Sequence, residues 1–175
     1  AALPAIRIRS DIERKRLHGI AEDAGSESGL GEGLYTAAAS ERLYDHLRNL
    51  ARIVLDSGHR VILDAAFLHA AHRRSAVQLA NEVDAAVVIV DVMAPESVLR
   101  SRLSARALAR DDASEADVDV LDYQLRTQDS FSDTEEALVI RWENVGDIDA
   151  TTLVAELQNR LETQDDRIPT GYIQP

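Results

Sequence analysis

The sequence has 175 residues, 45% of them hydrophobic and 29% charged, which is the composition of a single soluble globular domain. Its 31 acidic and 19 basic side chains give a net charge of −12, and so acidic a surface disfavours binding to nucleic acid or to an anionic membrane. The lack of cysteine excludes disulfides, thiolate catalysis and cysteine-ligated metals. No stretch has the pattern of a secretory signal or a membrane-spanning helix, so we expect a cytoplasmic protein.

The first part of the chain is predicted to hold a strand, a short helix and a loop. Residues 5–9 have the pattern of a short strand. Ser10 and Glu13 have capping-box spacing, which predicts a helix with Ser10 as its N-cap and an end near Leu17. Residues 22–35 contain four glycines, and this favours a loop.

Two helices with a buried strand between them are predicted next. Apolar side chains at helical spacing over residues 36–57, with Gly58 as a stop signal, predict a long helix. Residues 61–63 are a continuous apolar run that predicts a short strand ending in Asp64, and a further helix is predicted over residues 69–83. The apolar stripe of the long helix comprises Leu43, Leu47, Leu50, Ala51 and Val54.

The second half of the chain continues the alternation of strands and helices. The β-branched run at 86–90 predicts a buried strand of a parallel sheet that is covered on both faces. Pro95 suits the start of a helix, and residues 114–117 have the composition of another helix start. Residues 138–140 predict the last strand, and Asp149 is expected to cap a final helix.

This alternation predicts one three-layer α/β domain with right-handed crossovers. We expect the domain to span residues 1–163 and a tail or linker to follow at 164–175. In such folds ligands bind at the carboxyl ends of the strands, and Asp11 and Asp64 both follow a strand. A carboxylate in that place suits Mg²⁺ or a substrate hydroxyl. The alternatives are a helix-start residue for Asp11 and a turn residue for Asp64.

Arginines at helical spacing form the second candidate feature. Arg102, Arg106 and Arg110 are four residues apart and therefore share one helix face. Their guanidinium groups could clamp phosphates. The alternative is a solvated face that pairs with the acidic residues at 111–115.

Two further arginines and two histidines lie near the predicted strand ends. Arg14 is one turn after Asp11, and Arg73 is early in the helix after the second strand, although each could be an ordinary surface residue. His69 and His72 could belong to a zinc site, but a third well-placed ligand is not evident in the sequence.

Three segments together resemble small-molecule P-loop kinases. Residues 8–17 resemble the strand-to-helix segment that follows the P-loop helix, and their Asp-x-x-Arg element is similar to that of adenylylsulfate kinases. Residues 61–67 resemble a Walker B strand, and residues 100–117 resemble an arginine-bearing lid. The chain is most similar to the kinase-like, AAA-type ATP-binding domain that is fused to aminoglycoside-phosphotransferase-like domains. It is more distantly similar to zeta-toxin and gluconate-kinase types. The resemblance covers about residues 5–130.

The resemblance implies a substrate side and a metal. Asp11 would be the substrate-side carboxylate and a catalytic residue, with Arg14 beside it. Arg73 matches an arginine of this type of domain and is expected on the substrate side. Asp64 would hold Mg²⁺ through water.

The resemblance also implies a nucleotide side, with ATP as a substrate of the complete protein. Arg102 and Arg106 would be lid arginines that stabilise the transferring phosphoryl group, so both are expected to be catalytic and nucleotide-binding. Arg141 lies in a stretch where relatives contact adenine, which implies a nucleotide-binding role.

One departure from the family pattern concerns the phosphate-binding loop. Gly-x-x-x-x-Gly-Lys-Ser/Thr does not occur in these 175 residues, and the glycines at 29–33 lack the lysine. In the family, the strand before that loop is central in the sheet. We therefore expect a three-layer P-loop NTPase-like parallel sheet that lacks this strand and its helix.

Three explanations are open. The chain is a fragment of a longer protein, with a missing N-terminal segment and a fused kinase-like domain; or a partner or second copy supplies the strand; or the sheet is rearranged and the protein binds no nucleotide. We favour the first. The predicted function is an ATP-dependent kinase that phosphorylates a hydroxyl of a small metabolite in the complete protein, with this chain inactive alone. The alternative is a non-catalytic regulatory or assembly module.

Overall fold

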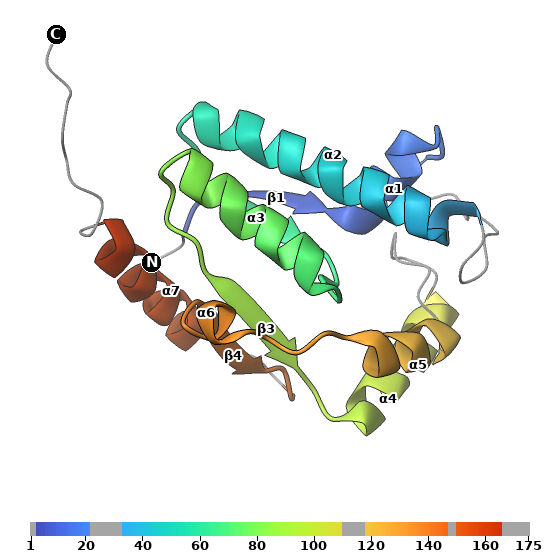
Figure 1. Ribbon diagram of the computed structural model, residues 1–175. Helices are drawn as coiled ribbons and strands as arrows, with labels where there is room; N and C mark the ends of the chain where they lie inside the picture. The colour runs from blue at the N-terminus through green and yellow to red at the C-terminus, as the bar shows by residue number, and fades with distance from the viewer. Residues whose placement is uncertain (1–2, 22–32, 110–117, 147–149, 166–175) are drawn as a thin grey trace, which may run out of the picture.

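The structure is a computed structural model and describes residues 3–21, 33–109, 118–146 and 150–165. Helices and strands alternate along the chain (Figure 1). In chain order the elements are β1 (Ile6–Arg9), α1 (Ser10–Leu17), the 3₁₀ turn η1 (Gly33–Tyr35), α2 (Ala37–Asp56), β2 (Val61–Asp64), α3 (Ala70–Glu82), β3 (Ile89–Met93), α4 (Glu96–Ala109), α5 (Val118–Thr127), α6 (Asp133–Glu136), β4 (Val139–Glu143) and α7 (Ala150–Asp165).

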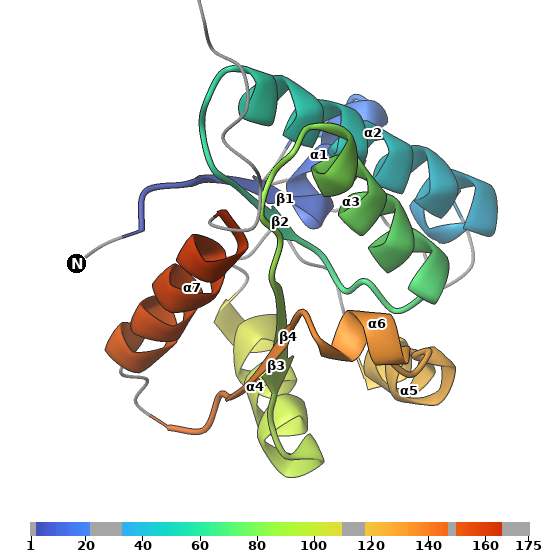
Figure 2. The same ribbon diagram turned by 60° about the vertical axis from the view of Figure 1, so that its left-hand side comes forward.

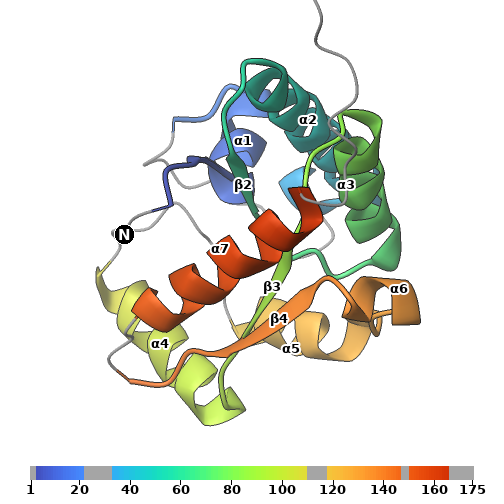
Figure 3. The ribbon, with the colours of Figure 1, turned by 90° about the vertical axis from the view of Figure 1, so that its left-hand side faces the viewer.

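The described strands form two separate parallel pairs. β1 pairs with β2 in the register Ile6 to Val61 through Arg9 to Asp64. β3 pairs with β4 in the register Ile89 to Val139 and onward. No hydrogen-bonded ladder joins β2 to β3 among the described residues, and Figure 3 shows the β3–β4 pair apart from β2.

The layers agree with the predicted α/β architecture. Figure 2 shows the four strands in a middle layer, with α7 on one side and α2, α3 and α6 on the other. The fold class is therefore confirmed: parallel strands lie between layers of helices. No helix within the described ranges is both long and apolar enough to cross a membrane.

The tightest packing lies between α2 and the β1–β2 pair. Leu43 and Leu47 are one helical turn apart and pack with Ile8 in one buried cluster. α2 begins where Thr36 accepts a hydrogen bond from the Ala39 amide at 3.2 Å, so the predicted helix over residues 36–57 is confirmed. This cluster fixes β2 and the carboxyl end that follows it.

Each strand pair has a face on which an apolar side chain is exposed to solvent. Ile62 on β2 is 49% exposed and Val92 on β3 is 57% exposed. Trp142 lies opposite Val92 in the β3–β4 register and is only half-buried. Strands of parallel sheets are normally covered on both faces, so these apolar side chains are more exposed than the fold class leads one to expect.

The predicted capping box at the start of α1 is wrong. The N-cap of α1 is Arg9, without a side-chain hydrogen bond, and Ser10 is the first helical residue. Glu13 has other partners: its buried carboxylate contacts Arg16 and lies 3.0 Å from His46 Nε2. A capping box does form at α6, between Ser132 and Glu135, where none was predicted.

The third strand lies three residues later than predicted. The run at 86–90 was expected to be the strand, but β3 spans Ile89–Met93. Val87 instead exchanges two hydrogen bonds, both at 3.0 Å, with the side-chain amide of Gln164 on α7. A side chain thus satisfies the backbone groups that a neighbouring strand would otherwise pair. The expected helix starts at 114–117 and Asp149 lie outside the described residues.

Candidate functional site

The candidate site lies at the carboxyl ends of β1 and β2. The register pairs Arg9 with Asp64, and Asp11 follows two residues later in the first turn of α1. Both aspartates are half-buried, and the positive end of the α1 dipole favours the charge of Asp11. The fold therefore brings the two predicted carboxylates to the same edge of the sheet.

Asp64 is paired with arginines of β1. Its Oδ2 accepts a hydrogen bond from Arg7 Nε at 2.8 Å, and Arg9 Nε lies 4.0 Å from the same oxygen. Two guanidinium groups of β1 thus lie near this carboxyl group. Mg²⁺ commonly takes only one or two protein carboxylates together with water and substrate phosphates, so the donor type at Asp64 fits this ion. The magnesium role of Asp64 stays a prediction.

Tyr44 of α2 is a site residue that the sequence patterns did not single out. Its Oη accepts a hydrogen bond from the Phe67 amide at 3.0 Å. Burial raises the pKa of the Tyr44 hydroxyl above its usual value, the Phe67 amide and Arg14 lower it, and the charges of Asp11 and Glu41 raise it. The charges of Asp11 and Arg14 thus act on the Tyr44 hydroxyl in opposite directions.

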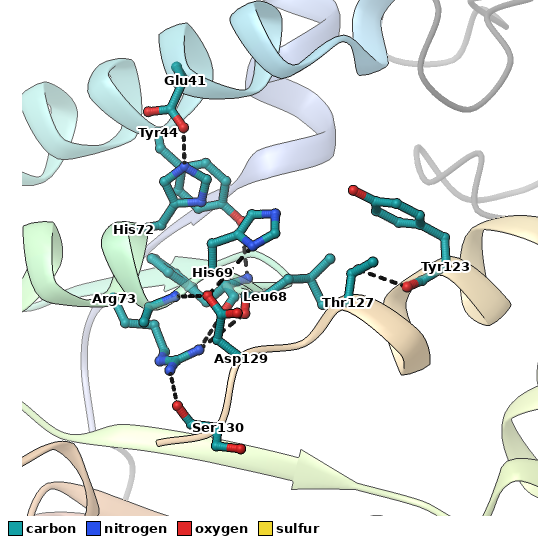
Figure 4. Close-up of polar contacts among 12 residues, drawn as sticks. Glu41, Tyr44, Leu68, His69, His72, Arg73, Tyr123, Thr127, Asp129 and Ser130 are labelled. Carbon is teal, nitrogen blue, oxygen red and sulfur yellow. Dashed lines mark hydrogen bonds and ion pairs between the residues drawn. The ribbon is translucent and has the colours of Figure 1, made fainter. Parts of the chain in front are cut away.

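An aromatic stack continues from Tyr44 (Figure 4). The His72 ring lies 3.7 Å from the Tyr44 ring with an interplanar angle of 15°, and the Phe67 ring lies 5.2 Å from Tyr44. His72 is buried, and its Nε2 is 2.9 Å from Glu41 Oε1. Among the described residues no three His, Asp or Glu side chains gather as metal ligands, so the zinc alternative gains no support.

Arg14 joins α1 to the segment before α2. Its Nη1 donates to the Leu34 carbonyl at 2.7 Å, and its guanidinium lies 4.9 Å from the Tyr35 ring centroid. Arg14 Nε is buried and has no hydrogen-bond partner. A buried donor without a partner is costly, so this atom is an unusual feature of the described structure, and the substrate-side role of Arg14 stays a prediction.

Arg73 is buried, with 3% of its surface exposed, and all five of its N–H donors are used. Nε and Nη2 donate to Glu135, at 2.8 and 3.4 Å, and Nη2 also donates to the Ser130 carbonyl at 2.9 Å. Nη1 donates to the carbonyls of Phe67 and Leu68, both at 3.2 Å. The geometry therefore favours a positioning role for Arg73 over the predicted contact with substrate.

The predicted lid is only partly described. Arg102 on α4 is exposed to solvent, whereas Arg100 on the same helix bonds to Glu96 at 2.8 Å and to Asp122 of α5 at 2.6 Å. These bonds, chiefly the one to Glu96, raise the pKa of Arg100. The backbone of Arg106 belongs to α4, but its side chain and residues 110–117 lie outside the described part. The sequence patterns missed Arg100 as the link between α4 and α5.

Arg141 on β4 pairs with acidic neighbours. Its Nη2 donates to both carboxylate oxygens of Glu136, at 2.6 and 2.9 Å, and these bonds raise its pKa. Asp91 of β3 lies 4.0 Å from Arg141 Nε. The predicted contact with the nucleotide stays a prediction, and it would have to compete with Glu136.

Comparison with known proteins adds the family. The sequence profile described as "AAA domain" matches residues 1–130. The chain belongs to the AAA domain family. Members of this family are nucleotide-binding, P-loop kinase-like domains that generally use ATP and Mg²⁺. The family match assigns no role to individual side chains of this AAA domain.

Curated relatives of this AAA domain are found in mycobacteria. They are uncharacterized proteins of Mycobacterium tuberculosis (Rv2004c and MT2060, from two strains) and of Mycobacterium bovis (Mb2027c). Each is 34% identical over 107 residues, which is 61% of this chain and 22% of the relative. The chain thus spans about a fifth of their length. No solved structure matches it.

Proposed function

We propose that this AAA domain is part of a small-molecule kinase that transfers the γ-phosphoryl group of ATP to a hydroxyl of a small metabolite. The observation that carries the proposal is the β1–β2 register, which sets Asp11 and Asp64 at one edge of the sheet. Arg14 follows Asp11 by one turn of α1, and the Tyr44 hydroxyl bonds to the Phe67 amide in the loop after Asp64, so this part of the fold combines acidic, cationic and hydroxyl groups that suit a polar, hydroxyl-bearing acceptor.

The proposed roles follow from position. Asp11 would orient the acceptor hydroxyl and take up its proton, with Arg14 holding the acceptor. Asp64 would hold Mg²⁺ through water, and the bound ion would offset the negative charge of the phosphates. Arg102 and Arg106 of α4 would stabilise the charge on the transferring group when the lid closes.

The proposal includes a further strand between β2 and β3. Two parallel pairs with no ladder between them, and exposed Ile62 and Val92, indicate that the described sheet is not closed in its middle. A strand carrying a phosphate-binding loop would pair with both edges, and the helix that follows such a loop could cover these side chains. We propose that another part of the complete protein, such as a fused kinase-like domain, supplies it rather than a partner or second copy.

Calorimetric titration of the complete protein with Mg²⁺–ATP tests the proposal. We expect binding in the wild type and a loss of affinity of about tenfold or more in Asp64→Ala and in Arg102→Ala, because the first removes the carboxylate that would hold Mg²⁺ and the second removes a positive charge that would face the phosphates. Asp56→Ala and Arg52→Ala, at charged positions on α2, are matched controls and should bind as the wild type does. Absence of Mg²⁺–ATP binding in the wild-type complete protein would refute the kinase proposal.

The alternative, a non-catalytic regulatory or assembly module, is favoured by one observation. Arg7 and Arg9 already surround the Asp64 carboxylate, so this residue has a purely structural partner. A module of this kind would form a stable, discrete oligomer and would bind no nucleotide. Sedimentation analysis of the protein, run beside the titration, separates the two functions.

A further inference from the structure

The loop after β2 contains a strained residue. Phe67 lies three positions after Asp64 and has a φ of +45°. Side chains larger than glycine are disfavoured in this left-handed region, and an aromatic residue gains no local hydrogen bond there. The other described residue of this kind is Asp84, whose type tolerates the conformation more readily. The surroundings of Phe67 must therefore hold it in place.

Two side chains from different helices hold the Phe67 backbone on both sides (Figure 4). The N–H donates to Tyr44 Oη of α2 at 3.0 Å, and the carbonyl accepts from Arg73 Nη1 of α3 at 3.2 Å. The next carbonyl, that of Leu68, accepts from Arg73 and from the Asp129 amide at 2.9 Å. Both polar backbone groups of the strained residue thus have fixed partners.

The two holding side chains are themselves fixed. Tyr44 stacks on the buried His72 ring, and His72 contacts Glu41 of the same helix as Tyr44. Arg73 is held by Glu135, and its guanidinium lies 4.7 Å from the Phe131 ring centroid. The strained turn is therefore determined by rigid groups outside the loop.

We propose that Tyr44 is a positioning residue, together with Arg73, and that it holds Phe67 in its left-handed conformation and thereby fixes the loop at residues 65–68 that follows Asp64 at the edge of the sheet. Tyr44 acts through the Phe67 amide and touches no reacting atom. This proposal deepens the proposed function and rests on it for its effect on nucleotide binding. If the hydroxyl of Tyr44 only filled space, its removal would leave the loop unchanged.

Two substitutions separate the positioning role from packing. Tyr44→Phe removes the hydroxyl and keeps the ring that stacks on His72. Phe67→Gly allows the left-handed conformation without strain, so the turn should depend less on Tyr44. Tyr123→Phe on the more exposed α5 is the matched control for loss of a phenolic hydroxyl.

Hydrogen–deuterium exchange of the complete protein, read in peptides that cover residues 65–69, is the first measurement. Tyr44→Phe should speed exchange there about tenfold or more, because the Phe67 amide loses its acceptor. Peptides from residues 47–56 of α2 and the Tyr123→Phe variant should exchange as the wild type does. Unchanged exchange at 65–69 in Tyr44→Phe would overturn the proposal.

Titration with Mg²⁺–ATP is the second measurement. Tyr44→Phe should weaken affinity severalfold, and it should weaken it less in the Phe67→Gly background. An equal loss in both backgrounds, or no loss at all, would overturn the positioning role. If the wild type binds no Mg²⁺–ATP, the proposed function fails, and the exchange data alone decide whether Tyr44 fixes the turn.

Discussion

The two strand pairs of this domain are packed to different degrees. The β1–β2 pair is covered on one face by α2, and Leu43 and Leu47 are almost fully buried there. On the β3–β4 pair, Val139 and Ile140 are buried whereas Val92 is exposed, and on α5 Leu121 is buried whereas Leu125 is exposed. The face of the first pair that meets α2 is thus closely packed, whereas Ile62 of the first pair, Val92 of the second pair and Leu125 of α5 stay exposed.

The ion pair that joins α3 to α6 should be the position where a substitution lowers the stability most. Arg73 of α3 and Glu135 of α6 form a buried ion pair, 62 residues apart in the chain. Arg73→Met leaves the Glu135 carboxylate buried without its partner, so we expect a loss of about 3–5 kcal/mol in the free energy of unfolding. Urea unfolding followed by circular dichroism measures it.

Two comparisons make the Arg73 result specific. Arg52→Met breaks the surface pair with Glu82 and should cost less than about 1 kcal/mol. The double variant Arg73→Met/Glu135→Leu removes both charges and should recover part of the loss. A loss below about 1 kcal/mol in Arg73→Met would show that the pair does not join the two regions.

Matched leucine truncations test the difference in packing directly. Leu47→Ala opens a cavity in the buried cluster beneath α2 and should lower the free energy of unfolding by about 3–5 kcal/mol. Leu121→Ala, on the less buried helix α5, should lower it by about 2 kcal/mol, because its surroundings can relax into the space. Thermal and urea unfolding of both variants under the same conditions supply the numbers. Equal losses of unfolding free energy would show that α2 and α5 are packed equally tightly.

Acid should weaken the same join by a smaller amount. The hydrogen bond from Arg73 lowers the pKa of Glu135 from 4.5 to about 2, against the opposing effect of burial. Because the pKa is depressed in the folded state, this stabilisation is fully present above about pH 4.5 and is lost as the pH falls towards 2. We expect about 2 kcal/mol to disappear between pH 6 and pH 3. Urea unfolding at both pH values measures this loss.

Glu135→Gln isolates this contribution from that of the other carboxylates. Its unfolding free energy should fall less between the two pH values than that of the wild type. If the two proteins lose the same amount, Glu135 does not titrate in the predicted way, and Arg73 is not its stabilising partner.

Local patterns predicted the elements whose signals lie within a few residues of one another. The spacing of Leu43 and Leu47, with Gly58 beyond, was enough to place α2, and the strand before Asp64 followed from a short apolar run. The third strand was misplaced because the partner of Val87 is Gln164, which no local pattern connects to it. Side-chain hydrogen bonds over such separations decide where a ladder starts.

In the candidate site, too, some residues could be predicted from local patterns and others depend on contacts between distant parts of the chain. Asp11 and Asp64 follow from the rule that ligands bind at strand ends, and the register places them as that rule expects. Tyr44 was missed because a tyrosine beside a leucine stripe reads as one more apolar contact, and its hydroxyl finds the Phe67 amide only in the fold. The role of Arg73 likewise depends on Glu135, which the sequence does not mark as a partner.

The edges of β2 and β3 that no described strand pairs also affect how the protein associates in solution. Within the described ranges neither edge is paired with another strand, Ile62 or Val92 is exposed beside it, and such an edge is a template for any strand that meets it. Its neighbours in a concentrated sample are other copies of the same chain. We therefore expect self-association through these edges to increase with protein concentration, and dilution to favour the monomer.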